Sequence, residues 1–393
     1  MASLSYITAG ESHGPALVAT VAGLPAGVGV DLDFINGELH RRQGGYGRGG
    51  RQRIETDSVE VLTGVRRGKT IGSPVTLVVR NKDSRLDDVT KTPPVHTPRP
   101  GHADLAGSIK YLTTDCRETL ERASARETAA RVAAGALARC LLRELGIEIF
   151  GLVRSIHAAT SDLAVTESNW RSLVAPRDAS STYCPDLVVT KRQEEAIHKA
   201  KVDKTTVGGV VEAHVFGVPP GIGSTMDRRD RLDARIAGEV MAVQAIKGVE
   251  IGLGFACAGR FGHEVHDAIR YDASRKRTPS VGFTRDSNNA GGTEGGMSNG
   301  SPIVVRAAMK PISTLLRGMP SVDLNSKDAA QSAYERSDIC AVSAASVVVE
   351  NVVAFEVARS LREKFGGDSL VEVHDQFERY LDFARRLPLT EGP

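Results

Sequence analysis

The chain has 393 residues, of which 41% are hydrophobic and 25% are charged, a composition typical of a globular protein with a large core. Its 50 Lys and Arg residues nearly balance 48 Asp and Glu residues, so bulk charge gives no argument for a nucleic-acid or membrane partner. Five scattered cysteines without a CxxC pair, no N-terminal secretory signal and no apolar run of about 18 residues predict a cytoplasmic protein.

Six segments carry clear secondary-structure patterns. β-Branched runs bounded by Gly or Pro predict strands at 16–24, 75–80, 210–218 and 303–309. Two long apolar stretches, each followed by a glycine, predict helices at 128–145 and 341–365. The polar stretch 160–204 is expected to be a peripheral excursion, and no linker composition divides residues 1–393 into separate domains.

Three short sequences recur in the same order. GLPAGVG at 23–29 matches GVPPGIG at 217–223, GSP at 72–74 matches GSP at 300–302, and the Glu-Arg pair at 121–122 matches that at 335–336. Either these matches are chance, or the chain contains a duplicated strand-and-helix unit related by a pseudo-twofold axis. The duplicated halves would span about 1–150 and 205–370.

The sequence GESHG at 10–14 places His13 between small residues. An imidazole titrates near neutral pH, and a sterically open one can protonate a leaving group. The alternative is a histidine that only hydrogen-bonds the backbone of a turn.

Four arginines and five glycines lie together in the segment 40–51. Glycine allows close approach of the backbone to a ligand, and the planar fork of arginine matches carboxylate and phosphate oxygens. The segment therefore predicts the wall of a pocket for a small polyanion. A solvated basic loop and an RNA-binding segment are the alternatives.

Further candidate motifs lie at 99–104 (RPGHAD), 121–128 (ERASARET), 288–300 (a Gly-rich loop), 309–314 (MKPIST) and 335–338 (ERSD). They combine cations and hydroxyls with tight turns or the start of a helix, which suits a phosphate or a flavin. Asp338 is either a functional carboxylate or a helix N-cap. The segment 64–70 is one residue short of a P-loop, and His263 and His266 lack zinc-protease spacing, so no metal site is predicted.

Taken together, seven blocks resemble those of the chorismate synthase family. They are GESHG at 10–14, RRQGGYGRGGR at 41–51, RPGHAD at 99–104, ERASARET at 121–128, GGTEGGMSNG at 291–300, MKPISTL at 309–315 and ERSD at 335–338. They occur in the family's order and span nearly the whole chain, which makes the combination highly specific.

The resemblance implies an enzyme that converts 5-enolpyruvylshikimate 3-phosphate to chorismate by 1,4-elimination of phosphate, with reduced FMN that is required but not consumed. By the same resemblance, His13 would protonate the departing phosphate, His102 would stabilise the reduced flavin, and Asp338 would help to take up the ring proton through flavin N5. The arginines that would bind the anionic substrate are Arg42, Arg48, Arg51, Arg126 and Arg336.

The positions that match the family's FMN contacts are Arg122, Ala123, Ser124, Gln244, Ala245, Gly295, Lys310, Pro311, Ile312, Ser313, Thr314 and Arg336. Arg42 and Arg48 also match positions linked to NADPH in members that reduce their own flavin, an activity that we do not assign here. The implied fold is α/β (α+β), a β-α-β sandwich with central helices between antiparallel sheets, and the implied assembly is a homotetramer.

Two departures from the family pattern stand out. Asp286 precedes the Asn pair at 288–289, where the family usually has Arg-Thr or Arg-Ser, and the region 82–98 is shorter than in many members. Two other functions remain open at this point: a flavin-dependent reductase that uses the same pocket, and an RNA-binding protein that uses the segment 41–51.

Overall fold

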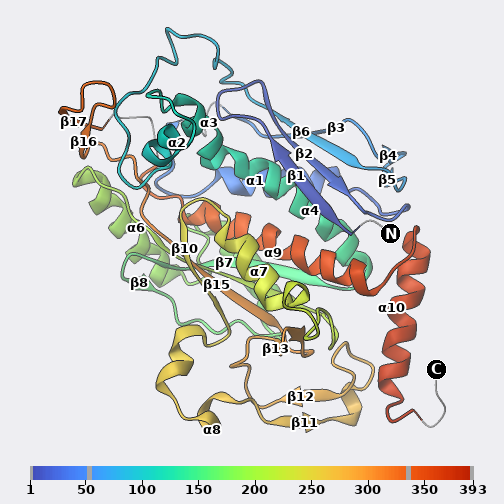
Figure 1. The fold of residues 1–393 in the computed structure, drawn as a ribbon. Helices are drawn as coiled ribbons and strands as arrows, with labels where there is room; N and C mark the ends of the chain where they lie inside the picture. The colour runs from blue at the N-terminus through green and yellow to red at the C-terminus, as the bar shows by residue number, and fades with distance from the viewer. Residues whose placement is uncertain (1–2, 51–54, 333–337, 390–393) are drawn as a thin grey trace.

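The computed structural model describes residues 3–50, 55–332 and 338–389 and contains both helices and antiparallel sheets (Figure 1). All six elements predicted from the sequence are present, with ends that differ by at most two residues. The strands are β2 (Ala16–Ala22), β6 (Val75–Arg80), β9 (Gly209–Phe216) and β15 (Ile303–Met309), and the helices are α4 (Thr128–Glu144) and α9 (Val342–Lys364). The strands β2 and β9 each end at a glycine with positive φ, at Gly23 (+88°) and Gly217 (+87°).

The first sheet has four antiparallel strands in the order β1-β2-β6-β3, with β1 at Ser5–Ala9 and β3 at Val59–Val61. Alternate residues of β2 are buried, so Leu17, Ala19 and Val21 share the face that packs on the helices. The second sheet has the order β10-β15-β9-β7-β8, with β10 at Ile246–Ile251, β7 at Glu148–Ile156 and β8 at Ala159–Thr160. Its strands are also paired antiparallel.

Helices fill the space between the two sheets (Figure 1). The helix α4 packs on the first sheet, α9 packs on the second, and the two helices pack on each other. Gly135 lies at their crossing, where a Cβ atom would come within 2.2 Å of the carbonyl oxygen of Asn351. The almost completely buried sequences of α4 and α9 follow from this central position.

Corresponding strands and helices of the two sheets follow one another in the same order along the chain. In the first, α1 (Leu32–Gln43) follows β2, and in the second, α7 (Leu232–Met241) follows β9. Each GSP sequence leads into the strand that pairs with β2 or β9, namely β6 or β15. The central helix of each half, α4 or α9, comes later in the chain.

The remaining elements lie around these layers. The helices are α2 (Asp104–Lys110), α3 (Arg117–Ala123), α5 (Trp170–Ala179), α6 (Leu187–Val202), α8 (Gly262–Val265) and α10 (Leu370–Arg385). The short strand pairs are β4 (Val65–Arg66) with β5 (Lys69–Thr70), β11 (Ile269–Tyr271) with β12 (Phe283–Arg285), β13 (Thr293–Glu294) with β14 (Met297–Ser298), and β16 (Pro320–Val322) with β17 (Ala329–Gln331). Over the described ranges, no helix is long and apolar enough to cross a membrane.

Buried charges connect the central helices. Glu38 of α1 accepts from Arg139 of α4 at 2.9 Å and from Asn351 of α9 at 2.8 Å. Burial raises the pKa of Glu38, but Arg139 and Arg41 outweigh this effect and lower it to about 2.

Glu356 of α9 has a different environment, because its Oε2 atom is buried without a hydrogen-bond partner among the described residues. Burial raises the pKa of Glu356 to about 7.

Candidate active site

The loop between β1 and β2 carries His13 and is fixed by a buried carboxylate of α3. The Nδ1 atom of His13 lies 2.9 Å and 3.0 Å from the two carboxylate oxygens of Glu121, and its backbone N–H donates to the same group at 2.8 Å. Burial raises the pKa of Glu121, but the hydrogen bonds and charge of His13 outweigh burial and hold it below its ordinary value. With Nδ1 donating to Glu121, the Nε2 atom faces Asp83 at 3.7 Å and Arg85 at 3.5 Å.

Two of the predicted substrate arginines share one buried carboxylate. Arg42, in the last turn of α1, and Arg126, just before α4, each lie 2.7 Å from Asp57. Arg126 also donates to Asn81 at 2.9 Å, and the amide of Asn81 donates to the carbonyl of Gly14 at 2.8 Å. Residues from four separate segments thereby join the arginine pair to the loop that carries His13.

Arg48 and Asp338 form an ion pair at 2.6 Å. The carboxylate of Asp338 also accepts from the backbone N–H of Gly49 at 2.6 Å, so Asp338 bonds the Arg/Gly segment and does not cap α9. Burial lowers the pKa of Arg42 to about 10, against the opposing charge of Asp57, and the charge of Arg48 adds to this lowering.

Each of these arginines keeps one buried N–H group without an acceptor in the described part of the chain. The three orphaned nitrogens are Nε of Arg42, Nε of Arg48 and Nη2 of Arg126. Buried guanidinium nitrogens are normally satisfied, and each unmet one costs free energy. Two of these donors lie on the Arg/Gly segment, and the third, on Arg126, is joined through Asn81 to the loop of His13, so the set is suited to binding an anion.

His102 lies in a second cluster, before α2. Its Nδ1 atom is hydrogen-bonded to the carboxylate of Asp104, and this carboxylate also forms an ion pair with Arg99 at 2.8 Å. Burial raises the pKa of Asp104, but hydrogen bonds from His102 and Arg99 outweigh it and hold the pKa far below its usual range. Arg99 donates to the hydroxyl of Thr314 at 3.1 Å, and Lys310 donates to the carbonyl of Gly101 at 2.5 Å. The RPGHAD loop thus packs directly on the segment 310–314.

The other predicted FMN contacts continue from this cluster to the start of α4. The backbone N–H of Lys310 donates to the carbonyl of Ala245 at 2.9 Å. Gln244 donates to Glu127 at 3.0 Å, and Arg122 lies 4.0 Å from the same carboxylate. Burial raises the pKa of Glu127, but Arg131 and the hydrogen-bonding neighbours outweigh it.

The junction of α3 and α4 joins both clusters. Ser124 donates to the hydroxyl of Ser12 at 3.1 Å, beside His13, and Arg122 donates to the carbonyl of Gly10 at 3.3 Å. Ala123 precedes Ser124 at the end of α3. Hydrogen bonds and ion pairs therefore connect His13, Arg42, Arg126 and most of the predicted FMN contacts.

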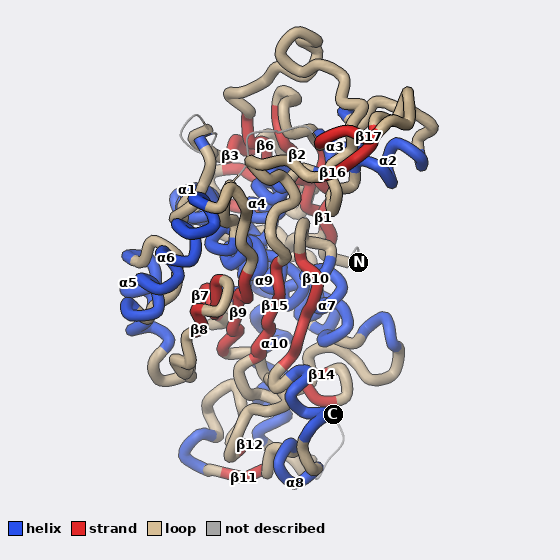
Figure 2. The backbone as a smooth tube through the Cα atoms, turned by 90° about the vertical axis from the view of Figure 1, so that its left-hand side faces the viewer, coloured by secondary structure: helices blue, strands red, loops and turns tan. Residues whose placement is uncertain are grey.

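Not every predicted site residue lies in this network. Gly295 forms the turn between β13 and β14, at the opposite end of β10 from α2 (Figures 1 and 2). Arg51 and Arg336 lie outside the described residues. Pro311, Ile312 and Ser313 lie within the segment 310–314, where the carbonyl of Ile312 accepts from Thr206 at 2.6 Å. Asp286 directly follows β12, at the end of the molecule away from α2 (Figure 1), and is bound to Arg270 at 2.9 Å.

Sequence reasoning assigned no role to four carboxylates of the site. They are Asp57, Asp104, Glu121 and Glu127. Three of them stand inside or next to a recognised block, which was the available signal. Asp57 follows an Arg/Gly segment without a local pattern, and its two arginine partners are 15 and 69 positions away.

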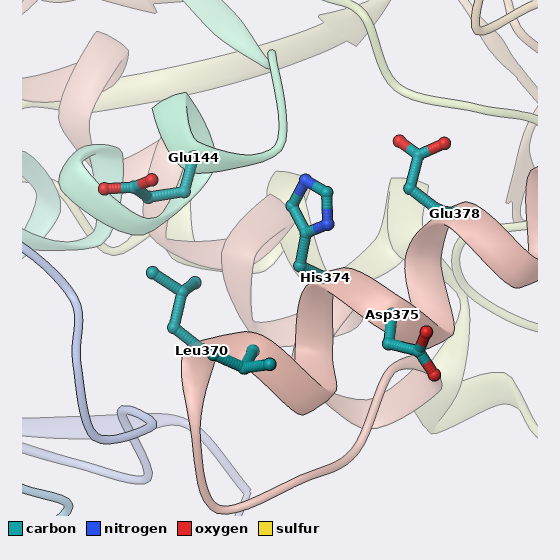
Figure 3. A pocket seen from close by; sticks show the side chains of 6 residues that line it. Glu144, Leu370, His374, Asp375 and Glu378 are labelled. Atoms are coloured by element: carbon teal, nitrogen blue, oxygen red, sulfur yellow. The ribbon is translucent and has the colours of Figure 1, made fainter.

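Two surface hollows lie elsewhere. One, of about 410 Å³, lies between the end of α4 and the first turns of α10, where Figure 3 shows Glu144 across from Leu370, His374, Asp375 and Glu378. The other, of about 550 Å³, is lined by Lys276, Arg277, Asp382 and Arg385. Neither includes a predicted site residue. The described ranges contain no group of three or more ligating side chains that could hold a metal ion.

Comparisons with known proteins agree with the blocks found in the sequence. The family model for chorismate synthase matches residues 4–361. A chorismate synthase of Desulforudis audaxviator is 52% identical over 97% of this chain and 98% of its own, and one of Desulforamulus reducens is 50% identical over 98% and 100%. A crystal structure of chorismate synthase superposes with a TM-score of 0.79 at 40% identity, covering 98% of this chain and 99% of that one. The chain therefore belongs to the chorismate synthase family of enzymes, which form chorismate in the shikimate pathway.

Proposed function

We propose that the protein removes phosphate from 5-enolpyruvylshikimate 3-phosphate by 1,4-elimination, with reduced FMN as an unconsumed cofactor. The observation that carries this proposal is the set of three orphaned N–H groups on Arg42, Arg48 and Arg126, the last of which is joined through Asn81 to the loop of His13. A substrate with two carboxylates and one phosphate supplies acceptors for them. Family membership supports the same reaction.

The elimination breaks one C–O bond and one ring C–H bond and forms a new C=C bond. His13 donates a proton to the phosphate oxygen as the C–O bond breaks, and Glu121 keeps the ring oriented for this transfer. Asp338 helps to take up the ring proton. Because Asp338 is bound to Arg48, an anion that draws Arg48 away releases one carboxylate oxygen, while the other still accepts from the N–H of Gly49.

The residues near Gln244 and Lys310 fit a flavin nucleotide. The Oε1 atom of Gln244 is buried and accepts no hydrogen bond from the described residues, so it is an acceptor that a donor of the cofactor could satisfy. Burial lowers the pKa of Lys310, and Lys247 adds to the effect, so an anionic phosphate near them would oppose this lowering. When bound, reduced FMN supplies the electron density that eases C–O cleavage. We assign His102, oriented by Asp104, to the flavin side of the site.

The fold and assembly are also proposals. We propose a β-α-β sandwich whose halves, about 1–150 and 205–370, are related by a pseudo-twofold axis. The shared order of strands supports it, and so do positive φ angles at matching glycines, such as Gly72 (+85°) and Gly300 (+87°). Superposition of the two halves tests it, and backbones that fail to superpose would refute it.

A homotetramer is the proposed assembly. Phe255 and Phe261 are 82% and 75% exposed within a single chain, and Ile269 and Tyr271 on the neighbouring hairpin are also exposed. Exposed aromatic surface of this kind is typical of a subunit interface. Light scattering measures the mass directly, and a monomer of 41.9 kDa at micromolar concentration would contradict the proposal. The cytoplasmic location remains a prediction.

The test of the function is an anaerobic assay with chemically reduced FMN and the phosphorylated substrate. Phosphate release with no net oxidation of the flavin supports the lyase, whereas stoichiometric flavin oxidation would instead identify a flavin-dependent reductase. The RNA-binding alternative has less support, because the side chains of Arg42 and Arg48 are only 3% and 9% exposed. A measured affinity for RNA that falls steeply with salt concentration would support the RNA-binding alternative.

A further inference from the structure

The segment 160–204 contacts the Arg/Gly segment that carries Arg42 and Arg48. Its helices α5 and α6 lie at one side of the molecule (Figure 2), and Asp178 of α5 is 3.6 Å from Arg41 in the last turn of α1. The chain that joins α5 to α6 is buried: Thr182 is fully inaccessible and Tyr183 is 8% exposed. This connection therefore lies against the body of the protein, although its sequence is polar and weakly patterned.

Tyr183 makes the central contact. Its hydroxyl donates at 2.8 Å to the carbonyl oxygen of Arg41 in the last turn of α1, which also accepts the backbone N–H of Gly44 at 3.0 Å. The backbone of Tyr183 is fixed in turn, because its carbonyl accepts from Val153 of β7 at 3.0 Å. The φ angle of Tyr183 is +60°, a conformation that a non-glycine residue adopts only when its surroundings hold it.

Neighbouring contacts hold the rest of the Arg/Gly segment. The N–H of Tyr46 donates to the carbonyl of Ser181 at 2.7 Å. A Cβ atom on Gly44 would lie 2.2 Å from the hydroxyl of Tyr183, and one on Gly47 would lie 2.6 Å from Ile197 of α6. The glycines of this segment thus allow the backbone to lie directly on the segment 160–204.

We infer that Tyr183 is a positioning residue for the anion-binding arginines. Its hydrogen bond fixes the end of α1 one residue before Arg42. The close packing of Gly44 and Gly47 on the segment 160–204 then holds the chain that leads to Arg48. The inference rests on the proposed function for its link to substrate. The hydrogen bond from Tyr183 to Arg41, called the clamp below, is present in the chain whatever the substrate is. Guanidinium groups bind an anion well only when their backbone is held in place, because orienting them after binding costs entropy.

The test compares Tyr183→Phe with Thr190→Val. The first change removes only the clamping hydroxyl. The second removes a buried hydroxyl of α6 whose partners, the carbonyls of Cys184 and Asp186 and the hydroxyl of Ser180, all lie within the segment 160–204. Both substitutions remove one hydroxyl and change the side-chain shape little. Thr190→Val is therefore the control for a general loosening of the segment 160–204.

Two measurements are made on wild type and both variants. In the anaerobic assay, Tyr183→Phe is expected to raise KM for the phosphorylated substrate by about twofold to tenfold, with kcat nearly unchanged, while Thr190→Val changes neither. In limited trypsin digestion without substrate, cleavage after Arg41, Arg42 or Arg48 is expected to accelerate by a similar factor in Tyr183→Phe only.

The two measurements separate the possible failures. If wild-type protein does not turn over the substrate, the proposed function fails, and trypsin cleavage still decides the clamp. If cleavage of the Arg/Gly segment is equally fast in wild type and Tyr183→Phe, or equally accelerated in Thr190→Val, the clamp is refuted. A change in kcat without a change in KM would likewise overturn the positioning role.

Discussion

Replacement of Glu356 by glutamine is expected to stabilise the protein at alkaline pH more than at acid pH. Glu356 is 2% exposed, and burial raises its pKa from 4.5 to about 7, against the opposing charge of Arg359. Between these two values the folded protein holds a proton that the unfolded chain releases, so the free energy of unfolding falls as pH rises. The shift of about 2.5 pKa units corresponds to a penalty of about 3 kcal/mol, complete above pH 7.

A glutamine side chain at this position would have no such penalty, because an amide does not ionise in this range. Urea unfolding of wild type and Glu356→Gln at pH 5 and pH 8, followed by far-UV circular dichroism, measures the difference. We expect the variant to gain about 2 to 3 kcal/mol relative to wild type between the two pH values. Packing changes contribute equally at both pH values and cancel. An equal gap between variant and wild type at pH 5 and pH 8 would refute the assignment of a protonated buried carboxyl.

Three further changes test the site. His13→Ala is expected to lower kcat by about 100-fold to 10,000-fold while FMN affinity, measured by fluorescence titration, stays nearly constant; an equal loss of both would contradict the leaving-group role. Arg48→Ala is expected to raise KM by about tenfold to 100-fold, and an unchanged KM would remove Arg48 from the anion pocket. Asp57→Asn leaves the buried cations of Arg42 and Arg126 without their shared carboxylate, so urea unfolding at pH 7 is expected to show a loss of about 3 to 5 kcal/mol. A loss below about 1 kcal/mol would mean that the two arginines do not depend on Asp57.

The central elements of the fold were predictable because their patterns are local. The strand β2 alternates buried and less buried residues and ends at Gly23, and α4 is rich in alanine and ends before Gly146. The helices α5 and α6 were not predicted, because they are amphipathic only weakly and Pro176 lies inside α5. Their burial depends on contacts with α1 and β7, which no local pattern encodes.

Much of the proposed site follows from the sequence for a different reason. His13, His102 and the arginines stand in recognisable blocks, so the family resemblance is enough to indicate them. The blocks do not indicate how these side chains are held. His102 and Asp104 are two residues apart, whereas Glu121 lies 108 residues from His13, and only the folded chain brings that pair together.

The buried carboxylates give the proposed site a common physical design. Glu121 orients His13, Asp104 orients His102, and Asp57 holds two arginines, so both proposed rings and two of the proposed cations are bound by a buried carboxylate. Buried cations need such partners, because an isolated charge in the interior is far too costly. The same partners limit how much positive charge the site presents. An incoming anion is therefore selected by the directions of the remaining N–H groups more than by net charge, and this favours a rigid ring acid over a flexible polyanion.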